Sequence, residues 1–273
     1  MRSASSITIN LLRKTTMNLR VPVALLCTLC FLTVLPLSAA MINLNGAGLF
    51  NTGVDNSGTA LGAAAADTHW QCSVNCSGNS FQAQGNTVTG QPFAGWPLPS
   101  TQNGTGSAAG PWVASATSSG SPLSQWISFQ ANVNSEPNTT TEYDYTETFN
   151  LSGFIGTTLE LIGSFAVDNT VLGILINGNV VNGTNSGNFG TSGSKTGFDI
   201  TNASCTPNCG LTSGTNTITF RTQNIQASSP NPSGLLVEFT SATATSTVPE
   251  PATLFGVGLG LSVLGLVYRR RRR

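Results

Sequence analysis

The chain has 273 residues, of which 39% are hydrophobic and 8% charged, and its formal net charge is zero. That balance hides an asymmetry, because residues 41–247 contain ten acidic residues against two basic ones, Lys195 and Arg221. A module this acidic has no basic face for phosphate groups, which excludes nucleic acid as a partner. Its roughly 200 residues are enough for one domain with a hydrophobic core.

Residues 1–40 have the pattern of a secretory signal peptide. They carry four basic residues and no acidic one, and an apolar run extends from Val21 to Leu37. Ser38 and Ala40 are small residues of the kind found before a signal-peptidase site, so we predict cleavage after Ala40. Met17 begins a more compact version of the same signal and is an alternative start. The other interpretation of this segment is a first transmembrane helix that stays uncut.

Two pairs of cysteines remain once the signal peptide is removed. Each pair has the spacing C-x3-C, with Cys72 and Cys76 in one pair and Cys205 and Cys209 in the other. An even number of cysteines in an exported protein indicates disulfides, and the simplest connectivity closes each pair locally. A four-thiolate zinc site is the alternative, which the spacing and the oxidising compartment disfavour.

Residues 41–239 are predicted to form one all-β module, an antiparallel β-sandwich or jelly roll. Short apolar or alternating runs follow one another at short intervals and are separated by turns rich in Gly, Pro, Asn and Ser. Asn177-Gly178 separates two of these runs and indicates a type I′ hairpin. Residues 240–247 are predicted to be a polar linker. The predicted strands are Met41–Leu44, Ser80–Val88, Trp126–Phe129, Tyr143–Phe149, Leu159–Val167, Val171–Ile176, Asn179–Val181, Phe198–Ile200, Thr217–Arg221 and Leu235–Phe239.

From Tyr143 to Thr240 the chain resembles the jelly-roll modules of the galactose-binding-like type. The segments that carry the resemblance are Phe149–Gly153, Asp168-Asn169, Ile176–Gly178, Gly214–Ile218 and Gly234–Glu238. The resemblance implies the jelly-roll fold, and such modules often hold a structural calcium ion. The hard oxygens of Asp168, Asn169 and Glu238 are the calcium candidates in this chain. No other cofactor is expected.

The sequence favours a protein that is not an enzyme. His69 is the single histidine, and no serine stands in a G-x-S-x-G motif, so a Ser–His–acid triad is not expected. The alternative is a secreted glycan-active hydrolase that uses paired carboxylates, although the density of acids is ordinary for a soluble surface. Its candidates are Glu136, Glu142, Asp144, Glu147, Glu160, Asp168 and Glu238.

One tryptophan is a candidate for contact with a sugar. Trp96 stands between Gly95 and Pro97 in a stretch rich in Gly and Pro, so we expect it to be exposed. The flat face of an aromatic ring suits a sugar ring. Trp126, inside an apolar run, is expected in the core instead.

The end of the chain is predicted to be a membrane-spanning helix. Ala252–Tyr268 carries no charge and spans about 25 Å as a helix, which is short but sufficient for a bilayer core. Pro249 and Pro251 keep the chain extended ahead of this helix. Basic residues beside a membrane span stay on the cytoplasmic side, which places the β-module on the other side. The basic cluster consists of Arg269, Arg270, Arg271, Arg272 and Arg273.

The last 26 residues resemble the PEP-CTERM sorting signal of Gram-negative bacteria. The motif Val248, Pro249, Glu250 and Pro251, the apolar segment 252–268 and the arginine cluster 269–273 occur in the order of that signal. The resemblance implies an exosortase as partner, a membrane cysteine transpeptidase that recognises Pro-Glu-Pro and cuts near it. An ordinary tail anchor with a chance Pro-Glu-Pro is the alternative.

The resemblance also implies a link with exopolysaccharide and biofilm matrix. We therefore predict export across the inner membrane, anchoring by the C-terminal helix, and processing to the cell surface or the matrix. The predicted role is a non-catalytic surface or matrix protein associated with exopolysaccharide. A purely structural or adhesive surface protein is a further alternative to the hydrolase.

Overall fold

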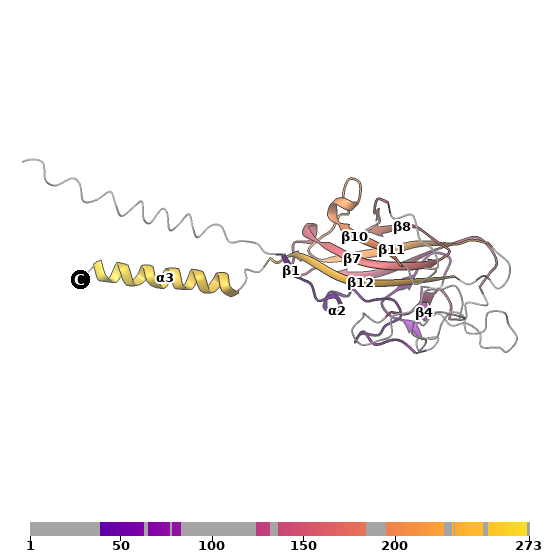
Figure 1. The fold of residues 1–273 in the computed structure, drawn as a ribbon, viewed down its shortest axis with the longest axis horizontal. Helices are drawn as coiled ribbons and strands as arrows, with labels where there is room; N and C mark the ends of the chain where they lie inside the picture. Colours follow the sequence, from indigo (N-terminus) through magenta and orange to yellow (C-terminus); the bar gives the residue numbers. More distant parts are fainter. Residues whose placement is uncertain are drawn as a thin grey trace, which may run out of the picture. The chain divides into compact units, whose positions relative to one another are not determined.

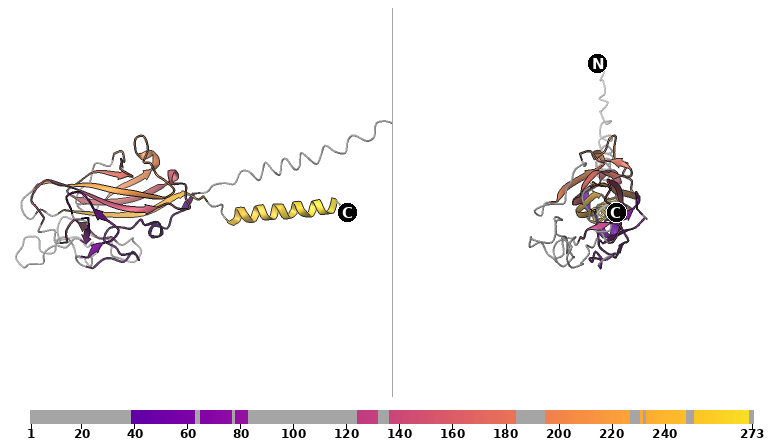
Figure 2. Two further views of the ribbon diagram at one scale, coloured as in Figure 1. Left: turned by 180° about the vertical axis from the view of Figure 1, so that it is seen from behind. Right: turned by 90° about the vertical axis from the view of Figure 1, so that its right-hand side faces the viewer.

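The computed structural model describes residues 39–62, 65–76, 78–82, 124–131, 136–183, 195–226, 231, 233–247 and 251–271. Residues Ala39–Val248 form one compact unit, and helix α3 (Pro251–Arg271) belongs to another. The first unit is built of antiparallel strands in two sheets, which confirms the prediction of an all-β body (Figure 1). Figure 2 shows the same strands from behind and from one end.

The larger sheet has seven strands within the described residues. Along its path the order is β10-β7-β12-β5-β4-β2, and β1 pairs with β12 off this path. The bounds are β1 Ala39–Met41, β2 Ala66–Asp67, β4 Ser80–Gln82, β5 Ile127–Ser128, β7 Glu160–Asp168, β10 Thr196–Thr201 and β12 Gly234–Thr245.

In the part of the chain that the structure describes, the smaller sheet has five strands in the order β3-β6-β11-β8-β9. The short helices described in the body are α2 (Leu44–Ala47), η2 (Gly156–Thr158) and η4 (Asn202–Ser204). The strand bounds are β3 Gln71–Cys72, β6 Thr141–Asn150, β8 Thr170–Ile176, β9 Asn179–Val180 and β11 Thr215–Asn224.

Aromatic side chains join the two sheets in one core. Phe220 on β11 lies with its ring 5.5 Å from that of Phe165 on β7 and 6.0 Å from that of Phe198 on β10. Trp70 packs against Phe220 at 5.9 Å and against Phe239 of β12 at 6.3 Å. Because these rings belong to both sheets and are buried, the body is a β-sandwich.

The first predicted strand is displaced in the structure. Met41–Leu44 was expected to be extended, but β1 covers Ala39–Met41 and Leu44 begins helix α2. The side chain of Asn43 accepts a hydrogen bond from the amide of Gly46 at 3.1 Å, which caps the helix at its start. Gly48, with φ of 83°, ends it in the left-handed conformation.

The prediction of a polar linker over residues 240–247 is wrong for most of that segment. Strand β12 continues to Thr245, and Ser246 forms a bridge with Phe154. The amide of Thr247 then donates to the carbonyl of Gly153 at 2.9 Å. The body of the sandwich therefore extends past the predicted boundary at residue 239.

Other local predictions are confirmed. Asn177 and Gly178 both have positive φ and connect β8 to β9 as a hairpin. The two local disulfides, Cys72–Cys76 and Cys205–Cys209, are both present, so the four-thiolate zinc alternative is wrong.

One predicted strand is shorter than expected, and another can be compared only over its first residues. The strand predicted over 126–129 shrinks to Ile127–Ser128, and that over 80–88 is described only for Ser80–Gln82.

The predicted C-terminal helix forms as α3, which covers all of residues 252–268. Among the residues that the structure describes, no helix is long and apolar enough to cross a membrane. The membrane span stays a prediction. The signal peptide lies outside the described residues up to Ser38, and Ala39 and Ala40 belong to β1, so the cleavage site also stays a prediction.

Candidate functional site

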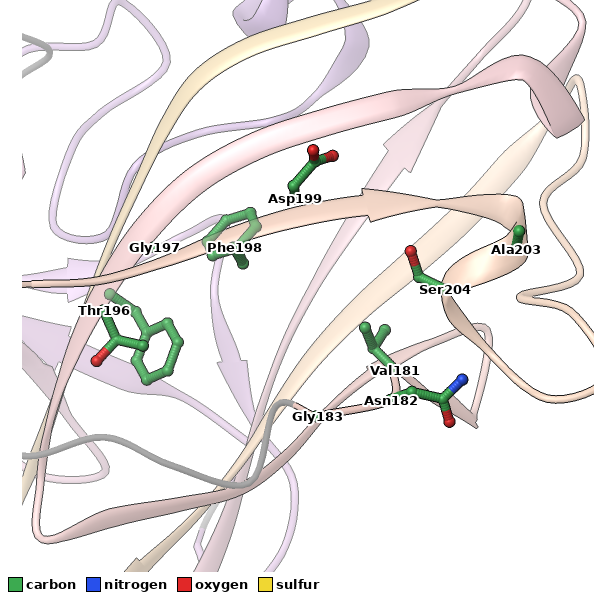
Figure 3. A pocket seen from close by; sticks show the side chains of 10 residues that line it. Val181, Asn182, Gly183, Thr196, Gly197, Phe198, Asp199, Ala203 and Ser204 are labelled. Atoms are coloured by element: carbon green, nitrogen blue, oxygen red, sulfur yellow. The ribbon is translucent and has the colours of Figure 1, made fainter.

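A cavity of about 410 Å³ lies between the margins of the two sheets (Figure 3). One wall is β10, at the end of the described strand order of the larger sheet. The opposite wall is the segment Val181–Gly183, directly after β9, at the end of the order of the smaller sheet. The side chains of Phe165, Thr196 and Phe198 also line it.

The second disulfide loop holds this wall in place. Val181 forms a bridge with Cys205, and the amide of Asn182 donates to the carbonyl of Ser204 at 2.8 Å. The side-chain amide of Asn182 donates to the hydroxyl of Thr206 at 3.2 Å. Ser204 accepts in turn from the amide of Thr201 at 2.9 Å. The polar groups of the cavity therefore project from a hydrogen-bonded frame.

The chemistry of the cavity suits an uncharged polar ligand. Thr196 and Phe198 alternate with Asp199 along β10, so the carboxylate projects to the other face of the strand (Figure 3). The other lining groups include the hydroxyl of Thr196 and the side-chain amide of Asn182, whereas the rings of Phe165 and Phe198 are 1% and 7% exposed and pack in the core. Hydrolysis by two carboxylates would need a pair of acids, and Asp199 is the single acid lining the described cavity.

Several of the acids proposed for a hydrolase are structural. Glu147 is 1% exposed, and its Oε1 accepts from the amide of Phe50 at 2.8 Å. Burial raises the pKa of Glu147 well above its ordinary value, against the opposing effect of that hydrogen bond. Asp144 forms a bidentate ion pair with Arg221 at 2.8 and 2.9 Å. These groups hold strands together and do not face a common cleft.

His69 is also a structural residue. Its ring stacks on that of Phe50, with the ring centroids 3.6 Å apart. Burial lowers the pKa of His69, which keeps the imidazole neutral at neutral pH. Its backbone amide donates to Asp67 at 2.9 Å, and burial raises the pKa of that carboxyl group.

The three calcium candidates do not converge as one set. Glu238 forms an ion pair with Lys195 and accepts a hydrogen bond from the hydroxyl of Ser124. The side-chain oxygen of Asn169 accepts from the amide of Ile225 at 2.6 Å. Among the described residues, no group of three His, Cys, Asp or Glu side chains is arranged for a metal ion.

Asp168 has a neighbour that the sequence did not indicate. The pKa of Glu136 is raised to about 8, chiefly by burial and further by the charge of Asp168. Thirty-two positions separate these two acids in the sequence, so no local motif could have paired them.

The remaining predicted site residues fall largely outside the described part of the chain. Trp96 does so, and the sugar contact expected there stays a prediction. Of the sorting motif, Val248, Pro249 and Glu250 are outside it, whereas Pro251 begins α3. Of the basic cluster, Arg269, Arg270 and Arg271 form the last turn of α3, and Arg272 and Arg273 lie beyond the described residues.

Residues 247–273 match the family model described as the PEP-CTERM protein-sorting motif. The match covers the predicted signal and marks an exported protein of a Gram-negative bacterium, sorted by its C-terminal signal and processed at the membrane by an exosortase-like enzyme. No curated protein matches the chain, and no solved structure matches it.

Proposed function

We propose that this exported protein is a non-catalytic component of the cell surface or extracellular matrix whose β-sandwich associates with exopolysaccharide. The observation that carries the proposal is the sorting motif at residues 247–273, which determines the route of the chain. The acidic body, with ten acids against Lys195 and Arg221, favours a neutral or cation-bridged ligand over a polyanion bound directly.

In this proposal α3 is a transient membrane anchor. Its segment 252–268 carries no charge, and its last turn carries three arginines, which would keep the C-terminus in the cytoplasm and the body outside. The exosortase-like enzyme then cuts near Pro249–Pro251 and releases the sandwich to the surface. This anchor is short, which suits a segment that serves processing.

The cavity beside β10 supports the carbohydrate part of the proposal. The hydroxyl of Thr196 and the side-chain amide of Asn182 are polar groups of the kind that bind the hydroxyl groups of a sugar. Trp96 is the second proposed contact. We include in this proposal the likeness of residues 143–240 to galactose-binding-like jelly-roll modules. The likeness alone does not identify a ligand, because that fold hosts many functions.

Mass spectrometry of the protein from native cells tests the route. We expect a mature chain that begins at Met41 and ends near Pro249. Replacing both Pro249 and Glu250 by alanine should leave the C-terminal tail attached, whereas Thr247→Ala should be processed normally. A mature wild-type chain that keeps Arg269–Arg273 would refute processing and leave an ordinary tail-anchored protein.

Co-sedimentation with exopolysaccharide from the same cells tests the ligand. Asn182→Ala removes a polar group of the cavity, and Trp96→Ala removes the second proposed contact. Val180→Ala is the control, because Val180 is 55% exposed and belongs to the same hairpin. Binding that is unchanged in both test variants would refute these contacts, no binding by the wild type would favour a structural role, and release of sugar would favour the hydrolase.

A further inference from the structure

One end of the sandwich buries a group of polar side chains drawn from several strands. Gly234 at the start of β12 is the register partner of Asp168 at the end of β7, and Ser233 directly precedes it. Asn224 ends β11 on the neighbouring sheet, where the amide of Asn169 donates to the carbonyl of Gln223 at 3.2 Å. The residues used below are Glu136, Asp168, Asn224 and Ser233, all at most 6% exposed.

Glu136 ties this group together. Its Oε1 accepts a hydrogen bond from the hydroxyl of Ser128 on β5. Hydrogen bonds from Ser233 lower the pKa of the Glu136 carboxyl group, and the charge of Asp168 acts on it in the opposite direction. Glu136 is therefore near the ends of both β7 and β12, although it precedes β6 in the chain.

Two oxygen atoms in this group are buried without a hydrogen-bond partner. They are Oε2 of Glu136 and Oδ1 of Asn224. The other half of the Asn224 amide is engaged, because its Nδ2 donates to the carbonyl of Asn231 at 3.0 Å. A buried polar atom without a partner costs about 1–3 kcal/mol, and native proteins contain few of them. Two such oxygens beside the carboxyl group of Asp168 favour a bound cation that these oxygen atoms can coordinate.

The charges at this end of the sandwich also favour a bound cation. Glu136 and Asp168 are two buried carboxyl groups close enough to interact. The two cationic side chains of residues 41–247, Lys195 and Arg221, form ion pairs with Glu238 and with Asp144. A divalent cation would balance two carboxylates and coordinate the oxygen atoms beside them.

We propose that Glu136, Asp168 and Asn224 form a binding site for a hard divalent cation, with Ca²⁺ preferred. The donors are carboxylate, amide and hydroxyl oxygens without a thiolate or an imidazole, which is the ligand set of Ca²⁺ and Mg²⁺. Ca²⁺ accepts six to eight oxygen ligands in irregular geometry, whereas Mg²⁺ demands a near-ideal octahedron and keeps its waters. Donors from separate strands and a loop suit the more permissive ion.

This site differs from the one that the sequence predicted, since it keeps Asp168 and replaces Asn169 and Glu238. Asp168 belongs to the larger sheet and Asn224 to the smaller one, so the cation would join the two sheets at one end of the sandwich. Binding to the folded state alone raises stability by mass action. An exported protein meets concentrations of Ca²⁺ at which sites of modest affinity are filled.

Titration of the full-length chain in detergent, after treatment with EDTA, tests the proposal. We expect one Tb³⁺ ion per chain, detected by luminescence excited through the neighbouring Tyr143 and Tyr145, and displaced by Ca²⁺. Adding Ca²⁺ at about a hundred times its Kd should raise Tm by roughly 5–10 °C. Mg²⁺ at the same concentration should raise it less. A wild type that takes up no ion and shows no change in Tm would overturn the proposal and leave Glu136 as a buried neutral acid.

A matched pair of substitutions locates the site. Glu136→Gln should lower the affinity for Ca²⁺ at least about tenfold, because it removes a charged ligand of similar shape. Glu160→Gln, which changes an exposed acid on β7, should leave the affinity unchanged. Equal affinities in both variants would place any bound ion elsewhere and refute the assignment. If Glu136→Gln does not fold, Asp168→Asn takes its place with the same expectation.

Discussion

Glu147 should make the protein less stable as the pH rises, and Glu147→Gln should remove that dependence. Its carboxyl group is 1% exposed on the core face of β6, beside Tyr145 and Phe149. Burial raises its pKa well above the ordinary value, and the charge of Asp67 adds to the effect. The folded protein therefore holds this carboxyl group in its protonated form over a pH range in which the unfolded chain has released the proton.

The sign and the size follow from this difference. Stability is complete below the pKa of the unfolded carboxyl group, about 4.5, and is lost as the pH rises toward the pKa in the folded state. Within that window unfolding releases one proton, so the free energy of unfolding falls by about 1.4 kcal/mol for each pH unit.

Denaturation of the full-length chain, followed by the fluorescence of the buried Trp70 and Trp126, measures this effect in EDTA at several pH values. The slope of unfolding free energy against pH should be shallower in Glu147→Gln than in the wild type by about 1.4 kcal/mol per pH unit. Any contribution of Glu136 is common to both proteins and cancels in the comparison. Glu142→Gln, on the same strand but exposed, is the control. Equal slopes in the wild type and Glu147→Gln would refute the reasoning.

Three further substitutions probe the fold, each measured as a change in the free energy of unfolding with Val180→Ala as a neutral control. Phe220→Ala removes a buried ring that packs between the two sheets and should lower the free energy of unfolding by about 3–5 kcal/mol. Gly178→Ala places a side chain at φ of 82° in the hairpin and should cost about 1 kcal/mol, although there is room for the methyl group. Replacing Cys205 and Cys209 together by serine opens a short loop and should cost about 2 kcal/mol. Phe220→Ala or the paired serines behaving like the control would contradict the packing and the cross-link described above.

The sequence predicted best those elements whose signal is local. Asn177-Gly178 sets a hairpin by its own backbone preference, and the structure has positive φ at both residues. In β6 the alternation of Tyr143, Tyr145 and Phe149 with polar residues predicted a strand, and the structure buries all three rings to at most 1% exposed. Each disulfide closes within five residues, which made the local connectivity the simplest prediction and the correct one.

The extension of β12 was missed because its alternation uses small residues. Ala242 and Ala244 are buried, whereas Ser241, Thr243 and Thr245 are partly exposed, so the segment has a strand's period of two. Alanine is only weakly hydrophobic, and serine and threonine are common in linkers. The composition of this segment therefore suggested a linker although its burial alternates as in a strand. Pairing with β1 and β7 supplies the missing stabilisation, and that pairing is a tertiary effect.

The proposed cation site could not be found from the sequence for a different reason. Glu136 and Asp168 come together because β7 and β12 pair in a particular register, which fixes where the end of β7 lies. Register depends on the packing of whole strands, and no short motif records it. The burial of Glu147 could not be predicted for the same reason. An acidic residue on the core face of β6 interrupts the apolar pattern, and its partner, the amide of Phe50, is distant in the sequence.

The pairing of β1 with β12 constrains the order of events during export. Ala39 and Ala40 pair with Thr245 and Ala244, so the predicted cut after Ala40 falls within a paired strand of the folded body. A peptidase needs an unpaired segment, and the cut must therefore precede the docking of β1. Cleavage would remove only the two outermost pairs, because the amide of Ile42 still donates to Ala242 at 2.9 Å. The signal peptide can therefore be removed early, and the remaining residues of β1 can pair with β12 afterwards.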